Sequence, residues 1–127
     1  MISSVSILVF IISQSQFAVG TSSNINDLID NGNSLSEAGQ YAEAITYFDK
    51  ALAIDPNNVD ALFNKGLALY FQGKSEEAIT YYDKVLAIDP NNVDALFNKG
   101  LALDTLGKSE AITYYDKVLA IDPNNVD

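Results

Sequence analysis

The stretch "AIDPNNVDALFNKGLAL" occurs at positions 53–69 and again at positions 87–103. Its repetition divides the chain into three aligned units, residues 25–58, 59–92 and 93–125, and residues 126–127 are a stub of a fourth. The aligned prolines Pro56, Pro90 and Pro123 are 34 and then 33 residues apart. A period of this length indicates a repeat protein in which each unit packs on its neighbours.

The second half of each unit has the apolar pattern of a helix. Apolar residues lie at i, i+1, i+4, i+7 and i+8, namely Ala44, Ile45, Phe48, Ala51 and Leu52 in the first unit and Ala78, Ile79, Tyr82, Val85 and Leu86 in the second. This spacing places them on one face of an α-helix and does not fit a strand. Gly39, Gly73 and Gly107 separate these helices from the first half of each unit. We therefore predict an all-α fold of six helices in three antiparallel pairs.

Residue types at the expected helix ends agree with this division. Asn58 and Asn92 are expected to cap the first helices of the second and third units, and Ser75 and Ser109 the second helices. Each Asp-Pro pair is expected to end a second helix, because the residue before a proline avoids helical geometry.

Three glycines lie inside the expected first helices, where each costs about 1 kcal/mol relative to alanine. They are Gly32, Gly66 and Gly100, and the small residues expected to face them are Ala44, Ala78 and Ala111. We expect the two helices of each unit to approach closely at these positions.

The third unit lacks one residue, because "KSEEAIT" at 74–80 becomes "KSEAIT" at 108–113. A deletion inside a helix would rotate the following apolar face by about 100°. Ala111, Ile112, Tyr115, Val118 and Leu119 keep their mutual spacing. We therefore expect the turn at residues 107–110 to absorb the deletion, with weaker capping of the next helix.

The spacing of large and small residues in these units resembles that of the tetratricopeptide repeat family. The matching residues of the second unit are Leu62, Gly66, Leu69, Ala78, Tyr82, Val85 and Pro90, and the other units match nearly as well. The chain departs from the family pattern at Leu62, where an aromatic is usual, and at Lys65 and Lys99, where apolar residues are usual. The resemblance implies an α-solenoid of three helix-turn-helix repeats in a right-handed superhelix.

The resemblance also implies a function, which is to bind peptide segments of other proteins in a concave groove lined by the first helices. The implied groove positions are Ile29, Asp30, Asn33, Phe63, Asn64, Leu67, Tyr70, Phe71, Phe97, Asn98, Leu101, Asp104 and Thr105. Some members clamp a terminal carboxylate there with lysine and arginine. The matching basic positions here are Ile29, Asp94 and Asn98, and only Asn33 and Asn64 retain the polar residues of such a clamp. An apolar or basic segment is therefore the expected partner.

Two alternatives remain open. Phe63 and Phe97 either offer aromatic surface to a ligand or fill the contacts between neighbouring units. The chain is accordingly either a peptide-binding scaffold or a structural, self-associating array, including a fragment of a longer one. For self-association as a homo-oligomer, the expected face lies on the last helix and consists of Ile112, Tyr115, Val118 and Leu119.

Charge and missing residue types restrict the function further. The formal net charge of -10 disfavours nucleic acid and anionic membrane surfaces as partners. The chain has neither cysteine nor histidine, so thiol chemistry and the usual nucleophile–base pairs are not expected. No phosphate loop or metal-ligand spacing occurs. We predict a protein that is not an enzyme and needs no cofactor.

The first 26 residues contain no charged side chain, and residues 7–12 are all large and apolar. Ala18 and Gly20 match the small residues of a signal-peptidase site, so we predict a secretory leader over residues 1–20 and a polar lead-in over residues 21–24. The apolar run is shorter than the roughly 20 residues that span a bilayer. A cleaved leader implies a secreted or extracytoplasmic chain, whereas the alternative, an uncleaved extension, implies a cytoplasmic one.

Overall fold

The computed structural model describes residues 24–125, and within that range the chain forms helices and no strand. The helices are α2 (Ile25–Glu37), α3 (Tyr41–Ile54), α4 (Val59–Phe71), α5 (Ser75–Ile88), α6 (Val93–Thr105) and α7 (Ala111–Ile121). The all-α prediction is confirmed. The predicted leader and the stub at 126–127 lie outside the described residues.

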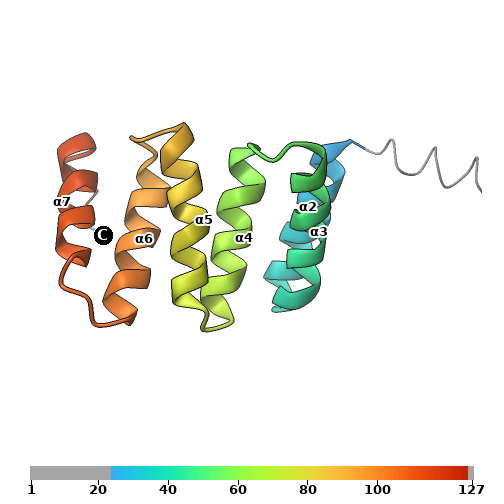
Figure 1. Ribbon diagram of the computed structural model, residues 1–127, viewed down its shortest axis with the longest axis horizontal. Coiled ribbons are helices and arrows are strands. Elements are labelled where there is room, and N and C mark those ends of the chain that lie inside the picture. Colours follow the sequence, from blue (N-terminus) through green and yellow to red (C-terminus); the bar gives the residue numbers. More distant parts are fainter. Residues whose placement is uncertain (1–23, 126–127) are drawn as a thin grey trace, which may run out of the picture.

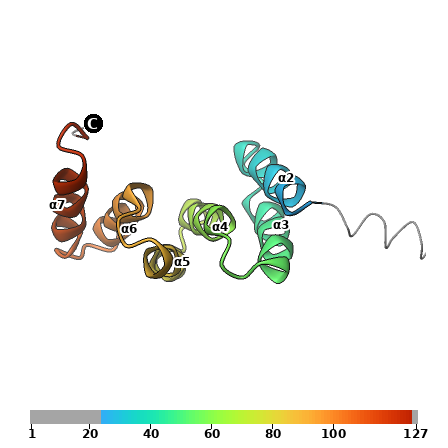
Figure 2. The same cartoon turned by 90° about the horizontal axis from the view of Figure 1, so that it is seen from above.

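The helices form a single row in chain order (Figure 1). Within each unit a first helix packs on a second helix, giving the pairs α2–α3, α4–α5 and α6–α7. Consecutive units meet through α3–α4 and α5–α6, and the first helices also touch through α2–α4 and α4–α6. Figure 2 shows the row from above, with α5 on the opposite side of it from α4 and α6. This arrangement is a helical solenoid in which each unit contacts only its neighbours.

No helix within residues 24–125 combines the length and the apolar character that a membrane crossing requires.

The predicted asparagine caps and helix ends are confirmed. Asn58 Oδ1 accepts a hydrogen bond from the backbone N–H of Ala61 at 2.9 Å, and Asn92 does the same for Ala95. Both asparagines thereby satisfy a backbone donor that a helix start leaves free. Asp55, before Pro56, is extended and ends α3.

The predicted serine caps are wrong. Ser75 is the first residue of α5 and is buried, while Lys74 is the cap residue and makes no side-chain cap bond. The backbone N–H of Ala78 bonds to the carbonyl of Lys74, so the helix starts one residue earlier than a serine cap would require. Gly73 allows this entry because its φ of +80° lies in the left-handed region, from which the chain turns sharply into α5.

The deletion in the third unit is absorbed in the turn, as predicted. α7 begins only at Ala111, and no side chain caps it. The backbone N–H groups of Ala111, Ile112 and Thr113 bond to carbonyls three residues earlier, which is the tighter pattern of a turn. Ala111 and Val118 remain buried, so the apolar face of the helix keeps its direction.

The glycines inside the first helices do permit close packing, but against aromatic rings and not against the predicted alanines. A Cβ placed on Gly66 would lie 2.7 Å from Tyr82 Cε1, and Gly32 and Gly100 face Phe48 and Tyr115 in the same way. The aromatic ring follows the alanine by one helical turn and is long enough to reach the neighbouring helix.

The predicted alanine partners instead lie at the contacts with other helices. Ala44 packs with Phe48 and with Ala68 of the next unit, and Ala78 packs with Ala102.

Tyr82 is the largest fully buried side chain, and its hydroxyl has no hydrogen-bond partner among residues 24–125. Burial, with a smaller contribution from Tyr70, raises the pKa of this hydroxyl above the ordinary value of 10.0. The equivalent residue of the first unit is Phe48, which has no hydroxyl. An unpaired buried hydroxyl costs about 1–3 kcal/mol.

We expect Tyr82→Phe to raise the free energy of unfolding by about 1 kcal/mol at neutral pH, because it removes the unpaired hydroxyl. The unfolded tyrosine ionises near pH 10, below the raised pKa of the folded state, so Tyr82 lowers stability progressively above about pH 10. The gain from Tyr82→Phe should therefore grow at alkaline pH. Urea unfolding at neutral pH and at about pH 10.5 measures both effects. The matched control is Phe48→Tyr, which should lower stability, and a destabilising Tyr82→Phe would contradict the prediction.

We expect insertion of one glutamate between Glu110 and Ala111 to stabilise the third unit. The insertion recreates the first turn of α5, where Glu76 and Glu77 lie near the positive end of the helix, a position worth about 0.3–1 kcal/mol for each acid. Urea unfolding and amide exchange at residues 111–113 measure the gain. Insertion of glutamine restores the length without the charge and should gain less. A loss of stability from either insertion would show that the short turn is the better fit.

Candidate functional site

The first helices α2, α4 and α6 present a common surface, which we call the first-helix surface. It contains a cavity of about 290 Å³ between α2 and α4. The residues lining this cavity are Asn26, Ile29, Asp30, Asn33, Asp60 and Asn64. Four of these were predicted groove positions. Asn26 and Asp60 were missed, although each lies one helical turn before a predicted groove residue, Asp30 or Asn64, on the same helix face.

Two predicted amides meet at this cavity. Asn64 Nδ2 donates a hydrogen bond to Asn33 Oδ1 at 2.9 Å, joining α4 to α2. Ile29 is buried beside them. The third amide is arranged differently, because Asn98 Nδ2 donates to the backbone carbonyl of Asp94 in its own helix. Two of the three amides therefore bond to each other between units, and the third bonds to the backbone of its own helix.

The predicted aromatic residues divide into two groups. Phe63 and Phe97 are half-buried and pack against Tyr82 and Tyr115, with ring centroids 5.8 Å apart in both pairs. Leu67 and Leu101 are likewise half-buried.

Phe71 is different, with an exposed fraction of 58%. Its ring stacks on Tyr41 at 5.5 Å and meets the edge of Tyr70 at 5.7 Å. These three rings form an aromatic strip at one end of the first-helix surface.

Tyr70 also links the second unit to the third. Its hydroxyl lies 3.1 Å from Thr105 Oγ1, and Thr105 Oγ1 donates its own hydrogen to the carbonyl of Leu101. Since a threonine hydroxyl carries one hydrogen, Tyr70 is the donor in the bond to Thr105. Asp104, the residue before Thr105 in the sequence, is exposed and adds a carboxylate.

The charge of the first-helix surface is negative. The first helices carry Asp30, Asp60, Asp94 and Asp104, all exposed, and none of the predicted groove positions is a lysine. Lys65 of α4 points away from this set and pairs with Asp49, and Lys99 of α6 pairs in the same way with Asp83. Burial lowers the pKa of each of these lysines, but the aspartate and a neighbouring tyrosine outweigh it, so that each pKa is raised. Both lysines therefore remain charged within their ion pairs.

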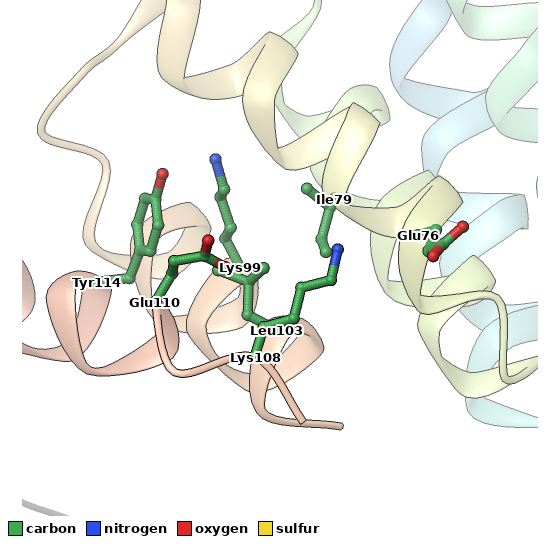
Figure 3. Close-up of a pocket in the computed structure, with 7 residues that line it drawn as sticks. All are labelled: Glu76, Ile79, Lys99, Leu103, Lys108, Glu110 and Tyr114. Carbon is green, nitrogen blue, oxygen red and sulfur yellow. The ribbon is translucent and has the colours of Figure 1, made fainter. Parts of the chain in front are cut away.

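A second cavity, of about 580 Å³, lies where α5, α6 and α7 meet (Figure 3). It is lined by Glu76, Ile79, Lys99, Leu103, Lys108, Glu110 and Tyr114. This cavity was not predicted from the sequence. The deletion marks its position, because Lys108 and Glu110 of the shortened turn before α7 line the cavity.

The predicted self-association residues are not equally accessible. Ile112 and Leu119 on α7 are 64% and 38% exposed. Val118 is buried, and Tyr115 is half-buried over Gly100. An apolar face on α7 therefore consists mainly of Ile112 and Leu119.

Within residues 24–125, no group of three or more acidic side chains is arranged to hold a metal ion. The first-helix surface presents amides, hydroxyls, carboxylates and aromatic rings, all of which can make non-covalent contacts with a partner.

Solved structures with this arrangement include domains that bind peptides. The first tetratricopeptide repeat domain of Spaghetti (RPAP3), bound to the HSP90 peptide SRMEEVD, is 29% identical to this chain, with a TM-score of 0.78 over 83% of this chain and 84% of that one. The first such domain of human RPAP3 is also 29% identical, with a TM-score of 0.76 over 80% and 81% of the two chains. The corresponding domain of Sgt2 from Aspergillus fumigatus is 25% identical, with a TM-score of 0.76 over 84% and 71%.

No curated protein matches the chain significantly in sequence. The first of these solved domains holds a peptide of another protein, so the fold is associated with protein interaction in general. Two family models match the sequence itself, and both are described as tetratricopeptide repeat, one over residues 29–93 and the other over residues 81–113. The chain therefore belongs to the tetratricopeptide repeat family.

Proposed function

We propose that the first-helix surface binds an extended segment of a partner protein that is apolar or basic. The observation that carries the proposal is the Asn33–Asn64 amide pair, which bridges two units beside the exposed carboxylates of Asp30 and Asp60. This combination offers hydrogen bonds to a peptide backbone and a negative charge to its side chains.

The amide pair has bonding capacity left for a ligand. Asn64 uses one of its two Nδ2 hydrogens on Asn33, which leaves its second hydrogen, its own Oδ1 and the amide group of Asn33. An extended peptide presents alternating backbone donors and acceptors, which such side-chain amides can match. The cavity of about 290 Å³ beside the pair has room for a side chain of the segment.

The charge of the surface selects against an acidic segment. The peptide SRMEEVD bound by the similar domain of Spaghetti (RPAP3) is rich in carboxylates. Here, Asp30, Asp60 and Asp94 would repel such a peptide, and the lysines of the first helices, Lys65 and Lys99, are held by Asp49 and Asp83. A lysine or arginine side chain in the segment would be attracted instead.

The aromatic strip of Tyr41, Tyr70 and Phe71 supports the apolar part of the proposal. Phe71 is 58% exposed although its ring is held in place by stacking on Tyr41. A rigid exposed ring offers apolar contact area to a ligand at little cost in conformational entropy.

A structural or self-associating array is the second candidate function. The exposure of Ile112 and Leu119 on α7 favours it, since these residues leave apolar area for another helix to cover.

Selection from a library of random peptides on the full-length chain tests the proposal. We expect enrichment of sequences that combine apolar residues with lysine or arginine, and no enrichment of acidic C-termini. A selected peptide should bind about 2–5-fold more weakly to the Asp60→Lys variant, the size expected for one exposed charge pair. Fluorescence polarisation at two salt concentrations measures the affinity, which should fall at high salt.

Glu77→Lys is the matched control, because it makes the same charge change in the first turn of a helix, on α5 and away from the first-helix surface. This variant should bind the selected peptide as the parent chain does. The proposal fails if acidic peptides are enriched, if nothing is enriched, or if both variants lose affinity equally.

A further inference from the structure

The two contacts between units are built from the same set of residues. At the first contact, Lys65 of α4 pairs with Asp49 of α3, and at the second, Lys99 of α6 pairs with Asp83 of α5. Each lysine side chain is only 14% exposed. Lys65 lies 4.4 Å from the ring centre of Tyr81, and Lys99 lies 4.4 Å from that of Tyr114. The lysine is therefore fixed in position by an aspartate of the preceding helix and a tyrosine of the following one.

Alanines flank each lysine and make the close contact. Ala61 and Ala68 of α4 are essentially fully buried, and they pack against α3 at Ala51 and at Ala44 with Phe48. Ala95 and Ala102 of α6 are also fully buried and pack against α5 in the same way. Helices α4 and α6 thus each carry alanine, lysine and alanine at i, i+4 and i+7, which lie on one helix face.

Helix α7 has the same residues that α5 uses in its contact with α6. Its Ile112, Asp116 and Leu119 correspond in the aligned units to Ile79, Asp83 and Leu86 of α5. Ile79 and Leu86 are half-buried beneath α6, whereas Ile112 and Leu119 are 64% and 38% exposed. Asp116 makes no ion pair with any residue between positions 24 and 125. The face of α7 therefore has the shape and charge of the one that α5 offers to α6.

We propose that α7 docks an amphipathic helix of another protein that carries alanine, lysine and alanine at i, i+4 and i+7. Its lysine pairs with Asp116, and its alanines allow the close approach that covers Ile112 and Leu119. This site is independent of the peptide site proposed for the first-helix surface, because it lies on a second helix at the end of the row (Figure 1).

A second copy of this chain does not offer such a helix. Its α4 and α6, which have the right residues, are already buried against α3 and α5. Its α2 has Asp27, Asn31 and Ser34 at the three positions, all exposed. Asp27 would add a negative charge next to Asp116, and α7 meeting α7 would bring two copies of Asp116 together. Both arrangements place like charges in one contact, which is unfavourable.

A helical peptide with the sequence of residues 59–73 tests the proposal. A hydrocarbon staple in place of Phe63 and Leu67 keeps it helical while leaving the alanine–lysine face free, and circular dichroism verifies this first. We expect it to shift the backbone amide resonances of Ile112, Asp116 and Leu119 in NMR spectra of the full-length chain. Replacing the peptide lysine by glutamate, or Asp116 by lysine, should weaken binding about 2–5-fold.

Combining the two replacements reverses the ion pair and should restore the affinity. Glu43→Lys is the matched control, because it changes the net charge equally but lies on α3, which does not contact α7, and it should leave binding unchanged. The proposal is overturned if the helical peptide does not bind, if Asp116→Lys has no effect, or if the shifts map to α2, α4 and α6. It is also overturned if light scattering shows that the chain alone dimerises and that Leu119→Glu abolishes the dimer. A second copy would then be the occupant of this face of α7. The peptide selection tests the first-helix surface, so its result does not depend on this outcome.

Discussion

The contact between a glycine of each first helix and an aromatic ring of its partner helix is the constraint on which the rest of the molecule depends. Gly66 has no side chain, and the ring of Tyr82 occupies the space that a Cβ would need, 2.7 Å from its Cε1 atom. Any larger residue would push the two helices of the unit apart. Because the ring reaches across from the second helix, it also supports Phe63 from beneath the first-helix surface. The same contact that closes the unit thus holds a predicted binding residue half-buried.

Closing each unit through glycine and an aromatic residue leaves the alanines free to join neighbouring units. Ala78, one turn before Tyr82, packs with Ala102 of the next unit, and the short side chains bring the helices close enough for Lys99 to reach Asp83. Partial burial makes this ion pair more sensitive to its geometry than a fully exposed one. The exposed residues at the two ends of the row differ. Helix α2 exposes polar residues, whereas α7 exposes Ile112 and Leu119 together with an aspartate.

Helix positions could be predicted from the sequence because period, asparagine caps and Asp-Pro pairs are all local signals. The serine caps were wrong because a serine at the first helical position and one at the cap look alike in sequence; only the bond from Ala78 N–H to the Lys74 carbonyl separates them. The glycine partners were wrong because spacing identifies residues on one face but not the reach of a long ring. Asn33 and Asn64 could be named as polar groove residues from the resemblance. Their mutual hydrogen bond, across 31 positions, depends on how two units are stacked.

The second and third units differ at three aligned positions besides the deletion, with Tyr70, Phe71 and Gln72 replaced by Asp104, Thr105 and Leu106. All three lie at or just beyond the end of a first helix. None of them is among the alanines and lysines, shared by the two copies, that make the contacts between units. Packing accounts for the shared Ala95 and Lys99, since a change at either would disturb the junction with α5. The differing residues instead meet each other, because the Tyr70 hydroxyl donates to Thr105. The first-helix surface thereby gains an aromatic strip from one copy and a carboxylate from the other. The two copies can thus contribute different chemistry to one ligand while retaining the same scaffold.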